Sequence, residues 1–266
     1  MKALFALGFR PLYLLAGLYA ALAVPVWALQ YARVLPPVDP LWHAHEMIFG
    51  YAFAVIAGFL LTAVRNWTGQ PTPSGNPLAA IAGLWTAARI VAPFSLAISS
   101  AIDLAFALAV AWGIGRPIVA SRNRNWYFVA FVLALGAASV LFQFAQRVAL
   151  QAGLDVVLLV IAIMAGRVVP GFTNNAVPGA DARRDPWVER AALGTVIVLL
   201  VLDILQLRTA AGVVALAGAI AHGARSLLWH PLRTRGRPIL WILHLSYAWV
   251  SVHLLLRGLA AFYFVS

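Results

Sequence analysis

The sequence has 266 residues, of which 63% are hydrophobic and only 10% are charged, whereas soluble domains carry about 25% charged residues. Its mean hydropathy is +0.89, so it has too little polar surface to cover a folded body in water. This composition excludes a soluble enzyme, a disordered chain and a coiled coil.

The charge pattern argues against nucleic acid as a partner. The net charge of +11 comes from 19 basic and 8 acidic residues, but the basic residues lie thinly between apolar segments and form no single patch. Cysteine is absent, which excludes disulfides and thiolate-ligated metals. Any metal must therefore be held by histidine, methionine or carboxylate groups.

Nine apolar segments are long enough to cross about 30 Å of hydrocarbon as helices. They lie at 11–31, 43–64, 77–93, 97–115, 126–146, 152–170, 187–206, 209–228 and 238–262. The sequence predicts an all-α, polytopic transmembrane bundle of eight or nine spans that forms one integral domain over residues 1–266. Because the first segment is long and contains Pro25, we expect a retained helix rather than a signal peptide.

The basic residues also predict how the chain is oriented in the lipid bilayer. A cytoplasmic N-terminus puts twelve of them, including Lys2, on the cytoplasmic side and only Arg33, Arg147 and Arg208 on the other. Cytoplasmic loops carry an excess of lysine and arginine. We therefore expect the N-terminus to be cytoplasmic.

The segment Trp42–Met47 places ionisable side chains at the outer end of the second span. On an ideal helix His43 shares a face with Glu46 and Met47, while His45 points nearly the opposite way. Either the helix is partly unwound or the histidines have separate roles, one as a ligand and one in orienting that ligand or moving a proton. A histidine hydrogen-bonded to a neighbouring helix is the simpler alternative.

The last span carries two polar stripes. His244, Tyr247 and Ser251 share one, and His253 and Arg257 belong to the other. His244 and His253 are about 13 to 14 Å apart along the axis and on opposite faces, so they cannot ligate one metal from a straight helix. By depth, His253 lies nearer to the outer pair of histidines than His244 does.

Charged residues inside other spans are expected to pair with each other. Arg89 and Asp103 lie at similar expected depth, and Asp203 and Arg257 form a second candidate pair. Asp155 is expected at the outer end of its span, without a special role.

The sixth span is expected to end at Pro170 and Gly171, because proline lacks the N–H that continues a helix. Arg167 before them either binds an anionic group, such as a propionate or a lipid phosphate, or is a cytoplasmic charge only. His222 and His230 are expected at solvent or at the membrane interface.

Several motifs together resemble the NnrS family. They are Trp42–Met47, Gly58–Val64, Asn66–Gly69, Gly166–Thr173 and Trp241–Leu245. Members of this family are multi-pass inner-membrane proteins of bacteria, described as containing haem and copper and linked to nitric oxide metabolism or nitrosative stress. Family members usually have more spans, so the resemblance implies a short member without the usual C-terminal helices.

The resemblance implies that His43, His45 and His244 serve haem or copper. We therefore expect b-type haem and consider copper as a second metal, with His43, His45, Met47 and His244 as metal candidates. His43, His45, His244, His253 and Arg167 are the candidates for cofactor binding. Glu46 and Tyr247 are expected to orient a ligand or transfer a proton, and no residue is assigned to catalysis.

The predicted function is a haem-binding protein of the bacterial inner membrane, with copper considered as a second metal, that acts in nitric oxide metabolism or in the nitrosative-stress response. Nitric oxide or another small ligand is the expected partner. Two alternatives stay open: a metal-free permease for a small solute, and a non-catalytic assembly or sensor subunit of a larger membrane complex. A homo-oligomer or a partner subunit is compatible with each of them. Nitric oxide reduction by this chain alone is disfavoured, because such chemistry needs several histidines at one centre and the sequence has six in total.

Overall fold

A computed structural model describes residues 3–36 and 40–263, so Lys2 lies outside the described residues. The described part is helical and contains no strand, which confirms the all-α prediction. The chain forms two compact units, Met1–Leu154 and Asp155–Ser266. The boundary between them lies inside one long helix, α7 (Gln146–Ala176).

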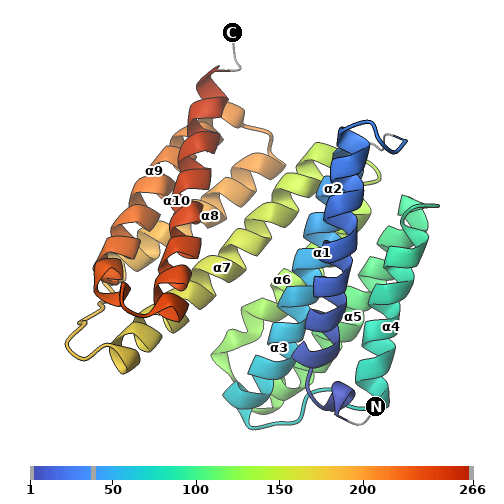
Figure 1. Ribbon diagram of the computed structural model, residues 1–266, viewed down its shortest axis with the longest axis horizontal. Helices are drawn as coiled ribbons and strands as arrows, with labels where there is room; N and C mark the ends of the chain where they lie inside the picture. Colours follow the sequence, from blue (N-terminus) through green and yellow to red (C-terminus); the bar gives the residue numbers. More distant parts are fainter. Residues whose placement is uncertain (1–2, 37–39, 264–266) are drawn as a thin grey trace. The chain divides into compact units, whose positions relative to one another are not determined.

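The first unit is built around α5, which contacts α3, α4 and α6, while α1 packs on α3 (Figure 1). Its elements before α7 are η1 (Leu4–Ala6), α1 (Phe9–Tyr31), α2 (Pro40–His45), η2 (Glu46–Ala52), α3 (Phe53–Thr68), α4 (Asn76–Val91), α5 (Leu96–Ala120), η3 (Arg124–Trp126) and α6 (Tyr127–Leu141). Gly69 ends α3 with φ +66°, a left-handed conformation that glycine adopts without strain.

The second unit contains α8 (Pro186–Ile204), α9 (Arg208–Leu228), η4 (Pro231–Thr234) and α10 (Pro238–Tyr263). In this unit α9 packs against both α8 and α10, and Figure 1 shows α9 and α10 side by side. Asp185 starts α8, because its carboxylate accepts the N–H groups of Trp187 at 2.8 Å and Val188 at 3.0 Å.

Seven helices of the described chain are long and apolar enough to cross a membrane, fewer than the eight or nine predicted. They lie at Phe9–Tyr31, Pro40–Thr68, Leu96–Ala120, Arg124–Leu141, Gln146–Ala176, Arg208–Leu228 and Pro238–Tyr263. Of the other two predicted spans, α4 has only 16 residues, too few to cross about 30 Å at 1.5 Å per residue. The helix α8 carries three charges, Glu189, Arg190 and Asp203.

Two local features differ from a regular helix pattern. The second span contains a π-helical segment, η2, directly after His45, so the side-chain directions of an ideal α-helix do not apply there. The prediction that Pro170 ends a helix was wrong, because α7 continues through it to Ala176. Tertiary bonds hold this last part: Thr173 bonds to His244, and Asn174 bonds to the backbone of Ala182.

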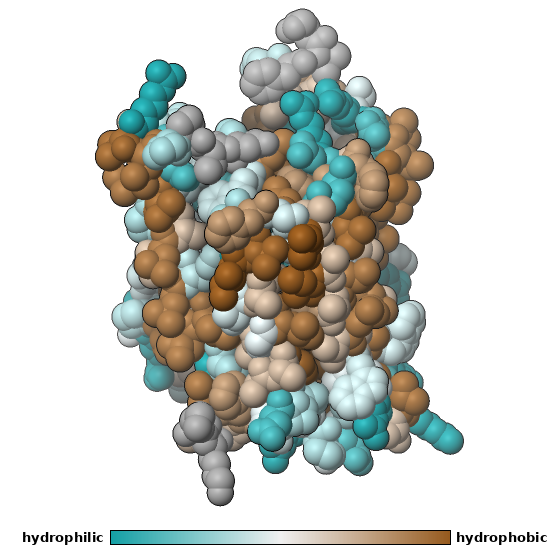
Figure 2. All heavy atoms as spheres, turned by 90° about the vertical axis from the view of Figure 1, so that its right-hand side faces the viewer, coloured by the Kyte–Doolittle hydropathy of each residue, from teal (hydrophilic) through white to brown (hydrophobic). Residues whose placement is uncertain are grey.

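The surface agrees with a membrane location. On the face drawn in Figure 2, hydrophobic side chains gather across the middle and hydrophilic ones gather near the two ends. Large apolar side chains such as Leu22, Val119 and Ile220 are exposed. A soluble protein rarely presents such a continuous apolar surface, whereas a bilayer solvates it.

Candidate functional site

A closed ring of hydrogen bonds, which we call the Arg89 ring, lies in the core of the first unit. Arg89 donates to Glu46 Oε2 at 2.6 Å and to Asp103 Oδ1 at 2.5 Å. Ser139 donates to Asp103 Oδ2 at 3.0 Å and lies 3.3 Å from His45 Nε2. His45 Nδ1 lies 2.9 Å from Glu46 Oε1 and closes the ring. The five residues come from α2, η2, α4, α5 and α6, and all are buried.

Both ring nitrogens of His45 have partners in the Arg89 ring. The Glu46 carboxylate accepts from Nδ1, and Nε2 lies 3.3 Å from the hydroxyl of Ser139, which also bonds to Asp103. Arg89 pairs with both carboxylates, because a buried charge needs a partner in a low-dielectric interior. In this arrangement neither nitrogen of His45 is free to bind a metal.

His43 has a different environment. Its ring stacks on Trp27 with centroids 4.1 Å apart and an angle of 17° between planes. Its buried Nδ1 atom has no hydrogen-bond partner among the described residues. Met47 is half-buried within η2. The two histidines therefore occupy separate environments. Between His45 and α3 the chain forms the π-helical segment η2.

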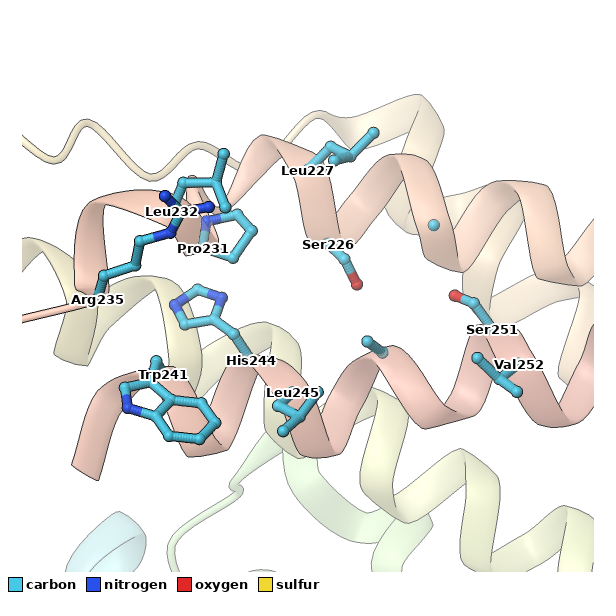
Figure 3. A pocket seen from close by; sticks show the side chains of 12 residues that line it. Ser226, Leu227, Pro231, Leu232, Arg235, Trp241, His244, Leu245, Ser251 and Val252 are labelled. Carbon is cyan, nitrogen blue, oxygen red and sulfur yellow. The ribbon is translucent and has the colours of Figure 1, made fainter. Parts of the chain in front are cut away.

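The second unit places His244 beside a largely apolar pocket between α9, η4 and α10 (Figure 3). The cavity has a volume of about 730 Å³. Its lining consists of Gly223, Ser226, Leu227, Pro231, Leu232, Arg235, Trp241, His244, Leu245, Ala248, Ser251 and Val252. Figure 3 shows the hydroxyl groups of Ser226 and Ser251 turned toward each other across the space between the two helices.

His244 is only 5% exposed, and its two ring nitrogens differ. Nε2 lies 2.9 Å from the hydroxyl oxygen of Thr173 on α7, whereas Nδ1 is buried and has no hydrogen-bond partner in the described chain. Trp229 packs at the ring edge, with centroids 6.5 Å apart. An unpaired imidazole nitrogen beside an apolar cavity is suited to bind a metal atom there.

Behind Trp229 lies a second polar cluster, centred on Arg225. Arg225 forms a bidentate pair with Glu189, both distances being 2.6 Å, and also donates to the carbonyl of Ala162 at 2.8 Å. It donates to the hydroxyl of Tyr247 at 2.7 Å, and its guanidinium lies 5.1 Å from the Trp229 ring. The candidate Tyr247 is therefore held by a buried cation rather than facing the pocket.

The prediction that His222 lies at solvent or at the interface was wrong, since its exposure is 0%. Its Nδ1 atom lies 2.6 Å from the Tyr247 hydroxyl, and its Nε2 atom lies 2.9 Å from the carbonyl of Ala192. His222 lies inside the predicted span 209–228. The rule that ionisable residues inside spans need partners was therefore sufficient to predict that His222 is bonded inside the protein.

At the other end of α10, Arg257 bridges two carboxylates. It pairs with Asp155 of α7 at 3.1 Å and with Asp203 of α8. Asp155 is fully buried, so the expectation that it has no special role was wrong. His253, one turn before Arg257, has a buried Nε2 atom without a hydrogen-bond partner among the described residues.

The metal candidates belong to both units of the chain. Within the described residues, no three histidine or carboxylate side chains are placed to hold one metal ion. His43 and His45 lie in the first unit and His244 in the second. Arg167 is exposed on α7 and is not among the residues that line the pocket.

Thr173 and Ser139 are the functional candidates that the sequence pattern did not single out. Each bonds to a histidine predicted as a ligand, His244 and His45 respectively. A hydroxyl side chain within an apolar helix is common, so neither residue type carries a signal by itself. Their partners are 71 and 94 positions away along the chain, and only the packing of helices brings them together.

The apolar helices and the buried ionic clusters define a multi-pass helical membrane protein. The particular family follows from a comparison with family models. The model described as NnrS protein matches residues 3–266, so the chain belongs to the NnrS family. Neither the curated proteins nor the solved structures provide a match.

Proposed function

We propose that this chain is a haem-binding protein of the bacterial inner membrane that acts in nitric oxide metabolism or in the response to nitrosative stress. Membership of the NnrS family supports the link to nitric oxide. The haem assignment depends on one observation, the buried and unpaired Nδ1 atom of His244 beside the apolar pocket.

The residues around the pocket fit a haem with one histidine ligand. His244 would hold the iron, and side chains such as Leu227 and Val252 would exclude water from the site. Arg235, which also lines the pocket, is the cation available to pair with acidic side groups of the cofactor. Bound haem supplies an iron atom that coordinates nitric oxide.

Copper fits less well. The described residues offer no group of three or more histidine or carboxylate side chains for it, and both nitrogens of His45 are engaged in the Arg89 ring. His43 has an unpaired buried nitrogen, but it belongs to no such group of side chains among the described residues. Copper is therefore left out of the proposed function.

Replacing His244 with alanine is expected to remove the haem. The detergent-purified protein from haem-replete cells is measured by absorption spectroscopy, oxidised and dithionite-reduced, with iron and copper analysis of the same sample. The unmodified protein is expected to show a Soret band and near-stoichiometric iron, and His244→Ala to lose both. Ser246→Ala, at an exposed position of the same helix where the hydroxyl donates to the carbonyl of Ile242, is the matched control and is expected to retain both.

A colourless, iron-free unmodified protein would contradict the proposal. Solute flux in proteoliposomes would then support a permease, and a stoichiometric co-purified subunit would support an assembly or sensor role. Loss of the Soret band in His253→Ala but not in His244→Ala would assign the haem ligand to His253, on the other polar stripe of α10.

A further inference from the structure

A polar pocket of the first unit lies beside the last part of α5. Its volume is about 400 Å³, within the usual range of small-ligand sites, about 300–1,000 Å³. Four polar residues line it: Gln70, Thr72, Ser74 and Arg116. Because α5 is a candidate membrane span that ends at Ala120, Arg116 lies about one turn from the end of the span, where lipid headgroups meet water. The pocket therefore offers a cation and hydrogen-bonding groups at headgroup level.

Tight packing holds the loop that forms one wall of this pocket. The loop joins α3 to α4 and contains Pro71 and Pro73, whose rings restrict the backbone. A Cβ atom at Gly113 of α5 would lie 2.7 Å from Cγ of Pro73, so the close approach requires glycine. The backbone N–H of Gly75 donates to the carbonyl of Phe5 at 2.8 Å. The fold therefore forms this pocket before any ligand binds.

Arg116 forms no ion pair within the described chain. The described part of the first unit contains only two carboxylates, Glu46 and Asp103, and both pair with Arg89. The guanidinium of Arg116 lies 5.0 Å from the ring centroid of Trp112, one turn earlier on α5. An arginine held over an aromatic face keeps the N–H groups at its edge for an acceptor. This cation therefore lacks an anion, which must come from outside the chain.

The surface around the pocket is also positively charged. The N–H of Phe9 donates to Thr62 at 3.0 Å, and Asn123 donates to the carbonyl of Trp67 at 3.0 Å. The start of α1, the end of α3 and the turn between α5 and α6 therefore lie at one end of the unit. Four further exposed arginines lie at this end: Arg10, Arg65, Arg122 and Arg124. Basic residues at a membrane surface attract anionic lipids.

Apolar side chains continue from the pocket along the exposed face of α5. Leu108 and Trp112 are 54% and 57% exposed, and together with Arg116 they follow the four-residue spacing of one helix face. A molecule bound along this face meets apolar side chains toward the membrane interior and a cation at headgroup level. Phospholipids have this construction, because their acyl chains are joined to a phosphate. A free phosphate ion would use the cation alone.

We propose that this pocket binds the headgroup of an anionic phospholipid. Arg116 pairs with the phosphate, and the hydroxyl groups of Thr72 and Ser74 are further donors. The acyl chains lie along Leu108 and Trp112. Hydrogen bonds between a guanidinium and a phosphate are charge-assisted and strong. The inference goes beyond the proposed haem function and does not depend on it, because this pocket shares no lining residue with the pocket of the second unit.

Native mass spectrometry of the detergent-purified protein, titrated with phosphatidylglycerol, tests the proposal. One phosphatidylglycerol molecule is expected to bind more tightly than phosphatidylcholine, whose headgroup has no net charge. Arg116→Gln is expected to weaken this binding about 10-fold or more, because it removes a charge-assisted contact. Arg124→Gln is the matched control, since it removes an exposed arginine that does not line the pocket. It is expected to leave the affinity nearly unchanged, because salt screens a charge without direct contact.

Three results would overturn the proposal. The first is an Arg116→Gln variant that binds phosphatidylglycerol like the unmodified protein, or no more weakly than Arg124→Gln does. The second is displacement of the lipid by inorganic phosphate, which would assign the pocket to a free anion. The third is a dimer that Arg116→Gln dissociates, which would assign this face to a second copy of the chain. A protein without haem that binds phosphatidylglycerol through Arg116 would contradict the proposed function and still support this inference.

Discussion

Replacing Arg89 with leucine is expected to lower the free energy of unfolding by about 3–5 kcal/mol, the range for removing one partner of a buried ion pair. Arg89 is 6% exposed and bonds to the carboxylates of Glu46 and Asp103, both of which have 0% exposure. Without the guanidinium, the two buried carboxylates lose the cation that pairs with both of them. Thermal unfolding of the detergent-purified protein measures the change.

Two variants test whether charge balance causes this loss. Arg116→Leu removes an exposed arginine at the end of α5 and is expected to change stability by less than about 0.5 kcal/mol. Adding Asp103→Asn to Arg89→Leu removes one of the two carboxylates that have lost their cation and is expected to recover part of the stability. If Arg89→Leu unfolds at the temperature of the unmodified protein, the Arg89 ring has no structural role.

Replacing Gly166 with alanine is the second change with a large expected effect. A Cβ atom at Gly166 would lie 1.9 Å from Nη2 and 2.8 Å from Cζ of Arg225. The guanidinium has little freedom to move aside, because bonds to Glu189, Ala162 and Tyr247 hold it. We expect a loss of about 3 kcal/mol or more, because the added methyl group separates a buried ion pair.

Gly171 provides the control on the same helix. A Cβ atom there has nothing within 4 Å, so Gly171→Ala is expected to stabilise α7 by about 0.5–1 kcal/mol through reduced backbone entropy. The two alanine variants should thus shift the unfolding temperature in opposite directions. Equal shifts would mean that the Arg225 cluster adapts freely to the added methyl group.

The histidines show how much of the candidate site can be predicted from sequence patterns. The helical wheel separated His43 from His45, and the structure places them in different environments, one stacked on Trp27 and the other bonded to Glu46. The same wheel assigned Glu46 to the face of His43, and both side chains contact α1, Glu46 through Tyr19 and His43 through Trp27. The π-helical segment that begins at Glu46 was not predicted from the residue pattern.

Composition and hydropathy were enough to predict the class of the molecule. Hydropathy and charge are sums over single residues, so a +0.89 mean and long apolar segments suffice to predict a helical membrane protein. The motifs also sufficed to identify the family that the comparison confirms over residues 3–266.

Which polar groups bond to each other could be learned from the packed helices alone. The bond of Thr173 to His244, the burial of His222 and the continuation of α7 past Pro170 all depend on side chains from other helices. The number of candidate membrane spans also became clear only from the structure, since α4 is too short to cross the bilayer. The physical reason is that a hydrogen bond requires two groups within about 3 Å. That distance is fixed by the rotation and depth of packed helices, which a single sequence does not specify.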